Sequence, residues 1–301
     1  LGSPRMLILG FQHMFAMFGA TILVPLLTGL DIPTTLLMAG LGTLLFHLLT
    51  KRKVPAFLGS SFAFLGGYGA VAPLAGNGTM TNEQLLPYAC LGVACAGLVY
   101  LVMALLIKLI GVNRVMKFFP PVVTGPIIIS IGLGLSGSAI SNCNANWLLA
   151  VIALAVVIIF NVWGRGMAKI IPILLGVLIS FGAAILLAVT TGQSITVNGT
   201  EYIAIAGNEN LLIFSQAALD NLREAAWIGF PIQWKHTVFG GVDWSNTSMI
   251  VSSIIAIVPI ALATIMEHIG DISAISSTVE KNFIKDPGLH RSLFADNFST
   301  M

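Results

Sequence analysis

The chain has 301 residues, of which 56% are apolar and only 9% are charged. A soluble globular domain carries about 25% charged residues, and a soluble chain with so little charge would expose large apolar patches. The composition therefore excludes a soluble enzyme, a nucleic-acid-binding protein and a disordered scaffold, and it predicts an all-α polytopic membrane protein. The formal net charge of +2 implies no polyanionic partner, and three cysteines indicate no disulfide framework.

Long apolar runs follow one another along the chain. A helix needs about 20 apolar residues to cross the hydrocarbon core of a bilayer. Seven runs meet this requirement, near 6–28, 32–50, 85–110, 120–140, 147–163, 169–190 and 249–273. The segment 55–75 is also apolar but is interrupted by Gly59, Gly66, Gly67, Gly69 and Pro73. We expect it to cross as an eighth, irregular span.

The distribution of charge supports this irregular crossing. If 55–75 crosses, the loops alternate so that twelve of the 14 Lys and Arg residues lie on one side. The positive-inside rule makes that side cytoplasmic. We therefore expect a multi-pass protein of the plasma membrane with a cytoplasmic N-terminus.

One long polar stretch, 191–248, separates the last two spans. It contains short alternating runs such as Ile203-Ala204-Ile205, which are typical of strands. We expect an extracytoplasmic loop with strand character.

The last span carries three ionisable residues, Glu267, His268 and Asp271. Ionisable residues inside a span are costly and usually functional. Glu267 and Asp271 are four residues apart and share a helix face, whereas His268 points about 100° away. Two carboxylates in a low-dielectric site do not both ionise easily, which suits a group that takes up and releases a proton. The alternative is that the three residues lie near the cytoplasmic end of the helix, in contact with water. Against this, about 20 Å of helix separates Glu267 from Lys281, the first basic residue of the following loop.

A similar polar pair, Gln12-His13, lies in the first span. Because the first span runs outward and the last inward, the two pairs hint at an inverted repeat with a site at the midplane. The alternative is that His13 is a packed, hydrogen-bonding histidine.

The irregular span contains Gly59-Ser60-Ser61-Phe62-Ala63-Phe64-Leu65-Gly66-Gly67. Unwound backbone at membrane depth is tolerated only where it is buried in protein or lines a wet cavity. Its N–H and C=O groups could bind a polar ligand, and Phe62 or Phe64 could stack on a flat ring. The alternative is that the glycines permit tight helix packing. We expect no metal site, because Glu267 and His268 diverge on a helix and no second His or Cys cluster exists.

Three stretches resemble the nucleobase–ascorbate transporter family, especially its bacterial uracil carriers. They are three motifs: Gln12 to Thr21, Val54 to Phe64, and the stretch from Glu267-His268-Ile269-Gly270 through Lys285 to Ser292. The resemblance runs in register from about residue 5 to 301 and is weak over 191–248.

The resemblance implies a fold of fourteen spans, built as two inverted seven-span repeats with a core and a gate domain. Residues 1–190 would form the first repeat, with core spans to about 111 and gate spans from about 120. The loop 191–248 would follow, and 249–301 would begin the second repeat with the eighth span and a cytoplasmic segment. The chain therefore looks like a C-terminally truncated fragment that ends before the family's second substrate-binding motif.

By the same resemblance, Glu267 matches the glutamate that accepts hydrogen bonds from the nucleobase N–H groups. Phe62, with Ser61 beside it, matches the broken third span whose backbone contacts the base, and Ala20 matches a small residue facing the base. The resemblance also implies that Asp271 stands where some uracil carriers have a histidine, whereas relatives that carry xanthine, urate or ascorbate more often have aspartate. Ile-Gly-Asp is still compatible with uracil carriers of other bacteria.

The expected function is proton-coupled uptake of a nucleobase, with uracil as the first candidate substrate. Glu267, Asp271 and His268 would handle the proton, while Gln12, His13 and Ser60 would give polar support. No catalytic residue and no cofactor are expected. The expected partners are the nucleobase, the lipid bilayer and a second copy in a homodimer. The alternatives are a xanthine, urate or ascorbate carrier of the same family, coupled to protons or sodium, an intramembrane hydrolase using Glu267 and His268, and a channel.

Overall fold

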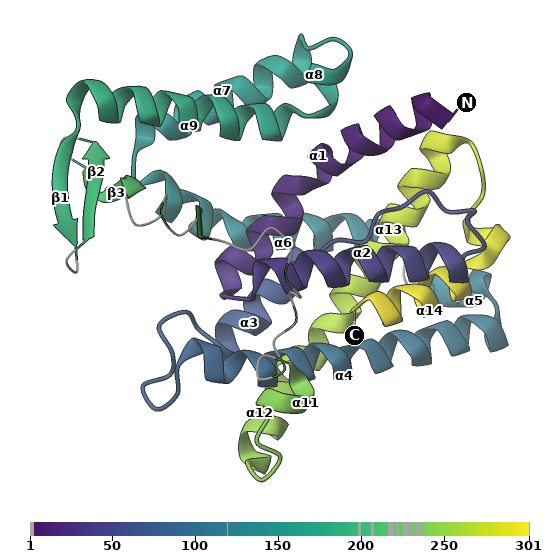
Figure 1. Ribbon diagram of the computed structural model, residues 1–301. Coiled ribbons are helices and arrows are strands. Elements are labelled where there is room, and N and C mark those ends of the chain that lie inside the picture. The colour runs from purple at the N-terminus through teal and green to yellow at the C-terminus, as the bar shows by residue number, and fades with distance from the viewer. Residues whose placement is uncertain are drawn as a thin grey trace. The chain divides into compact units, whose positions relative to one another are not determined.

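The computed structural model shows a mostly helical chain (Figure 1). It describes residues 3–118, 120–197, 200–205, 208–215 and 237–300, together with Asp220, Arg223, Glu224, Gly229, Ile232 and Trp234. Trp227 and Lys235 of the long loop lie outside the described residues.

The predicted spans correspond to helices. The first six regular spans are α1 (Ser3–Thr28), α2 (Ile32–Leu49), α4 (Asn82–Ile110), α6 (Pro121–Cys143), α7 (Trp147–Val162) and α9 (Pro172–Thr191). Short helices α5 (Val112–Phe118) and α8 (Met167–Ile170) precede α6 and α9. In the described part of the chain, five helical segments are long and apolar enough to cross a membrane: Ile32–Leu49, Asn82–Ile110, Gly125–Cys143, Pro172–Thr191 and Thr247–Val279. The protein is therefore a polytopic membrane protein.

The segment 55–75 is irregular, as predicted. Its backbone has no regular structure up to Ser61, then forms a 3₁₀ turn, η1 (Phe62–Phe64), and a short helix, α3 (Leu65–Val71). The side chain of Ser61 accepts a hydrogen bond from the amide of Ala63 and so caps this turn.

The last predicted span is interrupted, which the sequence analysis does not anticipate. It consists of α12 (Thr247–Ile257), the 3₁₀ turn η3 (Val258–Ile260) and α13 (Ala261–Val279). Pro259 lies in this turn and has no N–H group to continue the helical hydrogen bonds. A π-helical turn, η4 (Ile284–Gly288), and a further helix, α14 (Leu289–Thr300), follow.

Strand character in the long loop is confirmed. Strands β1 (Gln193–Val197), β2 (Thr200–Ile205) and β3 (Asn208–Ser215) form an antiparallel sheet in the order β1-β2-β3. A short helix, α11 (Val238–Gly241), lies at the far end of the loop. The strands lie in the long loop, and the mostly helical fold agrees with the predicted all-α polytopic membrane protein.

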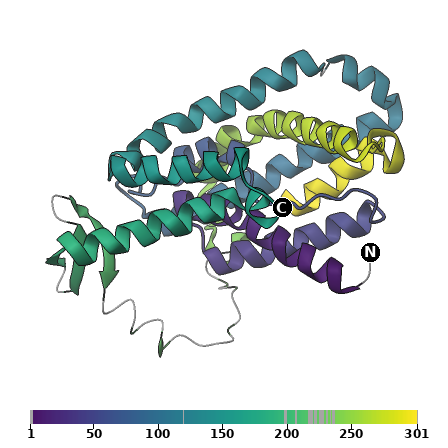
Figure 2. The same ribbon diagram turned by 90° about the horizontal axis from the view of Figure 1, so that it is seen from above.

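The chain divides into two compact units. The first contains Leu1–Gly19 and Gly134–Phe230, and in it α7 packs along α9 with the sheet at one end of α9 (Figure 2). Its small core contains Leu149, Ala184, Ala188 and Ile205.

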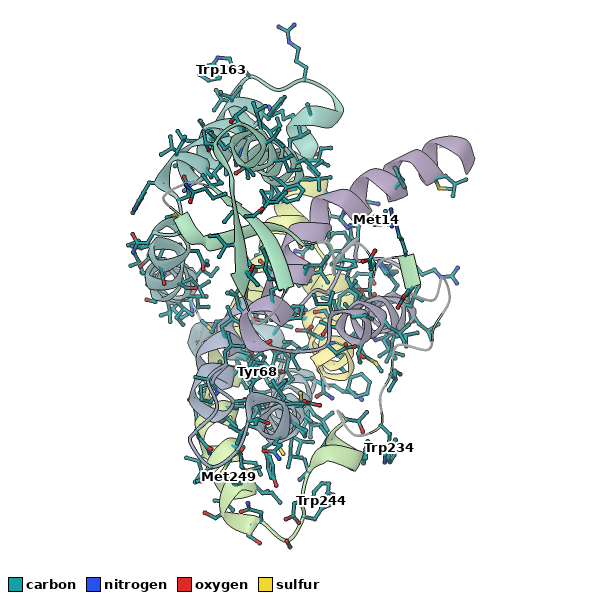
Figure 3. The ribbon with its side chains drawn as sticks, turned by 60° about the vertical axis from the view of Figure 1, so that its left-hand side comes forward. Met14, Tyr68, Trp163, Trp234, Trp244 and Met249 are labelled. Carbon is teal, nitrogen blue, oxygen red and sulfur yellow. The ribbon has the colours of Figure 1, made fainter. Side chains whose placement is uncertain are left out.

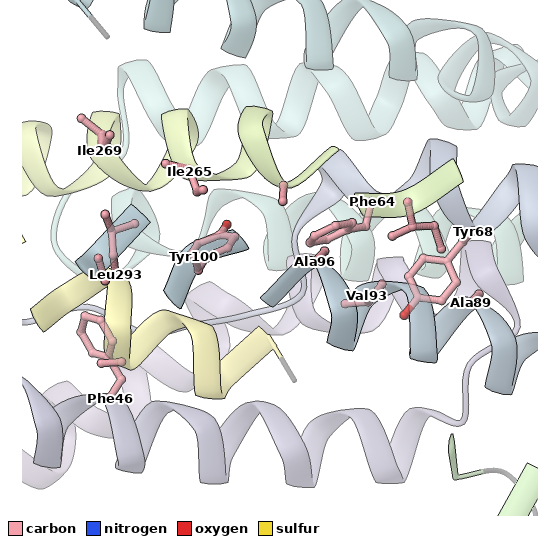
Figure 4. Packing of buried hydrophobic residues seen from close by; sticks show 14 of the residues in the cluster. Phe46, Phe64, Tyr68, Ala89, Val93, Ala96, Tyr100, Ile265, Ile269 and Leu293 are labelled. Carbon is pink, nitrogen blue, oxygen red and sulfur yellow. The ribbon is translucent and has the colours of Figure 1, made fainter. Parts of the chain in front are cut away.

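The second unit contains Ala20–Leu133 and Pro231–Met301 and holds the larger core. In this core α14 packs against α2 and α4. Figure 4 shows Ile265 and Ile269 of α13 facing Tyr100 of α4 and Leu293 of α14. This packing holds Glu267 of α13 next to the irregular segment.

Candidate functional site

The irregular segment is fixed to α2 by a threonine. The hydroxyl of Thr43 accepts a hydrogen bond from the amide of Leu58 at 3.1 Å and donates one to the carbonyl of Leu58, also at 3.1 Å. One side chain thus satisfies both backbone groups of a residue that has no helical partners. The extended backbone is therefore held in place as it approaches Ser60 and Ser61.

Ser61 connects the irregular segment to α13. Its hydroxyl donates a hydrogen bond to the Oε2 atom of Glu267 at 3.1 Å, across 206 residues of sequence. The Ser61 hydroxyl oxygen also accepts a hydrogen bond from the amide of Ala63 at 3.3 Å. Both Ser61 and Glu267 are partly buried, so the carboxylate meets the irregular segment away from bulk solvent.

The two aromatic residues of this segment have different surroundings. Phe64 is 5% exposed and belongs to the core with Tyr68. Phe62 is partly buried, as is Ser60. Phe62 is therefore the ring that retains accessible surface next to Ser61, whereas Phe64 serves packing.

One of the glycines of the irregular segment permits close helix packing, which was the alternative interpretation of these glycines. A Cβ atom on Gly67 would lie 2.9 Å from Ile260 Cδ1 and 3.0 Å from Ile257 Cγ1. This glycine therefore allows α3 to approach the interrupted span closely. Gly66 has open space at the corresponding position.

His268 lies on another side of α13 and has a different partner. Its Nδ1 atom is 3.0 Å from Oδ2 of Asp296 in α14, and the two side chains are only 7% and 14% exposed. The ring also packs edge-to-face on Phe46, with centroids 6.4 Å apart. Its buried Nε2 atom has no hydrogen-bond partner among the described residues.

Asp296 is an ionisable residue of this region that sequence reasoning missed. It lies in a segment predicted to be cytoplasmic, yet Leu289, Leu293 and Asn297 of the same helix are buried. These three residues recur every four positions, a helical spacing that could have revealed a packed helix. The position of Asp296 against His268 depends on tertiary packing.

Three carboxylates and a histidine interact electrostatically here. Glu267 interacts with Asp271, Asp296 and His268. Asp271 is exposed in contrast to Glu267, so the two predicted proton-sharing carboxylates have unequal surroundings. In the part of the chain that the structure describes, no group of three His, Cys, Asp or Glu side chains could hold a metal ion.

The roles predicted for Gln12, His13 and Ala20 of α1 are not tested by the described residues. His13 is exposed and belongs to the first unit. The side chains of Gln12 and Ala20 lie outside the described residues. Their predicted roles stay predictions.

An unwound segment facing a carboxylate, in a bundle of membrane-spanning helices, is the plan of many secondary transporters. A family model described as a permease family matches residues 4–301. The chain belongs to this permease family.

Individual relatives agree with this assignment. The chain is 37% identical over 302 residues to the uracil permease of Bacillus caldolyticus, covering 97% of this chain and 60% of that protein. It is 37% identical over 303 residues to the uracil permease of Bacillus subtilis (strain 168), covering 96% and 60%. It is 31% identical over 306 residues to the uracil permease of Escherichia coli (strain K12), covering 97% and 60%. The chain thus spans about three-fifths of the length of these relatives, each of which is named a permease.

Proposed function

We propose that the protein is a secondary active transporter that imports a nucleobase together with a proton across the plasma membrane. Uracil is the first candidate substrate. The observation that carries the proposal is the hydrogen bond between Ser61 and Glu267. This contact supports the interpretation that the Glu267 carboxylate and the irregular segment line the same binding site. The uracil permeases among the relatives support the substrate class.

The chemistry of uracil matches these two parts of the site. Its N–H groups can donate to the Glu267 carboxylate, and its carbonyl oxygens can accept from backbone amides near Phe62. The Phe62 ring can stack on the flat base. The Ser61 hydroxyl and the base would share the carboxylate, so the base would bind at a group that is already oriented.

The proton would be held by the acidic groups of α13. Glu267 and Asp271 lie one helical turn apart. Two ionised carboxylates at this spacing repel each other, so ionising both costs free energy. Binding one proton removes that repulsion, so the proton and the substrate can favour the same state. The His268–Asp296 pair lies on another side of the helix and would keep α13 oriented during the cycle.

The proposal includes the transport fold. Residues 1–190 form the first of two inverted seven-span repeats, with core spans to about 111 and gate spans from about 120. The loop 191–248 is extracytoplasmic, 249–301 begins the second repeat and the N-terminus is cytoplasmic. Movement of core against gate then opens the site alternately to each side, and a homodimer stays a prediction.

Glu267→Gln tests the proposal. It removes the charge while keeping the shape and one acceptor oxygen, and we expect uptake of labelled uracil to be lost while the protein still reaches the membrane. Glu280→Gln is the matched control, since Glu280 is exposed just beyond the end of α13, and its uptake should persist. Unchanged uptake by Glu267→Gln refutes the proposed role.

A purine or ascorbate substrate is the second candidate, favoured by Asp271 in place of the histidine of some uracil carriers. Competition of labelled uracil uptake by xanthine and ascorbate, with and without sodium, separates the two. Inhibition by uracil alone, and dependence on an imposed proton gradient rather than on sodium, supports the first proposal. Stronger inhibition by xanthine or ascorbate supports the second.

A further inference from the structure

Three large aromatic side chains are exposed close together in the sequence before α12. Trp234, Phe239 and Trp244 are 70%, 76% and 58% exposed. Figure 3 shows Trp234 and Trp244 at one end of the second unit, beside α11 and the start of α12. We call these three residues the aromatic patch.

The aromatic patch is held in a defined conformation. The rings of Trp234 and Phe239 stack, with centroids 6.5 Å apart and planes 18° from parallel. The hydroxyl of Thr237 donates to the carbonyl of Trp234 at 2.7 Å and accepts from the amide of Gly240 at 3.3 Å. A Cβ atom on Gly240 would lie 2.6 Å from Trp234 Cδ1, so glycine permits this close turn.

The segment that carries the patch is also attached to α4. The amide of Asp243 donates to the hydroxyl of Tyr88 at 3.2 Å, and Val242 is buried against the core. The rings therefore point outward from a backbone that is fixed on its inner side. Holding three aromatic rings in water is unfavourable, so this arrangement favours an apolar environment outside the protein.

The position of the patch indicates what that environment is. Trp244 lies three residues before Thr247, where the membrane-spanning segment Thr247–Val279 begins. Tyr88 lies near the start of Asn82–Ile110, another such segment. The patch therefore lies at the level where two spans leave the hydrocarbon core.

The charge of the segment agrees with this placement. The segment 234–246 contains two charged residues of opposite sign, Lys235 and Asp243. The Asp243 carboxylate accepts hydrogen bonds from the amide and the hydroxyl of Ser245 at 3.0 and 2.7 Å. Tryptophan is enriched at membrane–water boundaries because its ring is apolar while its N–H can donate to polar groups.

We infer that the aromatic patch is a membrane-interface anchor that inserts between the headgroups and the upper acyl chains of the leaflet at the N-terminal end of α12. Its occupant is lipid, because the patch continues directly into a membrane span. The anchor would fix the depth and tilt of α12 and, through η3, the position of α13 with Glu267.

Lipid quenching of tryptophan fluorescence tests this inference. The intact protein carries Trp147→Phe, Trp163→Phe and Trp227→Phe with either Trp234→Phe or Trp244→Phe, and any tryptophan beyond residue 301 is also replaced by phenylalanine. It is reconstituted in phosphatidylcholine vesicles. The lipid is brominated near the headgroup end of its acyl chains or near the chain ends. We expect the remaining tryptophan to lose more fluorescence with the shallow bromines than with the deep ones.

A single substitution gives a second measurement without removing the other tryptophans. Trp244→Phe alone should lower the fraction of the total fluorescence that shallow bromines quench. The inference is overturned if neither bromine position quenches the patch tryptophans, because another protein surface then covers them. Strong quenching by aqueous iodide without quenching by lipid also overturns it, because the rings then face water.

Discussion

Replacing Ser61 by alanine tests the connection between the irregular segment and α13. The change removes the donor to Glu267 Oε2 at 3.1 Å and the acceptor for the Ala63 amide at 3.3 Å. A hydrogen bond to a charged group contributes about 1.5–3 kcal/mol. The 3.1 Å separation is long for an O–H···O bond, and both residues are only partly buried, so we take the lower end of that range.

The expected effect is weaker binding of uracil. Because about 1.4 kcal/mol corresponds to a factor of ten in an equilibrium constant, Ser61→Ala should raise the Kd about tenfold. The loss of the cap at Ala63 should add to this by loosening the turn that presents Phe62. Binding of labelled uracil to the purified intact protein measures the change, and thermal unfolding shows whether the variant is folded.

Ser273→Ala is the matched control. Ser273 also lies on α13, and its hydroxyl donates to the Ile269 carbonyl one turn earlier, away from the irregular segment. We expect its Kd to stay near that of the unchanged protein. If Ser61→Ala binds uracil as tightly as Ser273→Ala, the hydrogen bond to Glu267 does not organise the site and the reasoning fails.

Two further predictions concern the packing of the second unit. Asn82→Ala should lower the free energy of unfolding by about 1–3 kcal/mol, because the Asn82 amide donates to the carbonyls of Thr28 at 3.1 Å and Ala72 at 2.8 Å and joins three helices; an unchanged melting temperature would contradict this. Lys53 and Asp286 form an ion pair at 2.6 Å between side chains that are 44% and 69% exposed, so solvent screens it. A double-mutant cycle with Lys53→Ala and Asp286→Ala should give a coupling energy below about 1 kcal/mol that falls with added salt, and a larger, salt-independent coupling would show that the pair is not screened.

Much of the fold is predictable because membrane spans are defined by length and hydropathy. The apolar runs predict α2, α4 and α9 closely, since every backbone group in lipid must be satisfied within a helix. Glycines and a proline likewise indicate the irregular segment 55–75, which includes the short helix α3. The 3₁₀ turn at Pro259 was missed because the surrounding residues keep the hydropathy of one continuous span.

The site is predictable in part for a related reason. Glu267 is conspicuous because a carboxylate inside a span is costly, and its helix geometry separates it from His268. Ser61 lies in an apolar stretch whose glycines and proline disfavour a continuous helix. Asp296 was missed because its significance depends on contact with His268 across 28 residues, which arises only when α14 packs against α2 and α4.

The most direct test of the central claim is a structure of the intact protein with uracil bound. The account predicts the uracil ring within hydrogen-bonding distance of the Glu267 carboxylate and of the backbone near Phe62. A uracil ring bound elsewhere, with Glu267 touching only protein or lipid, would contradict it.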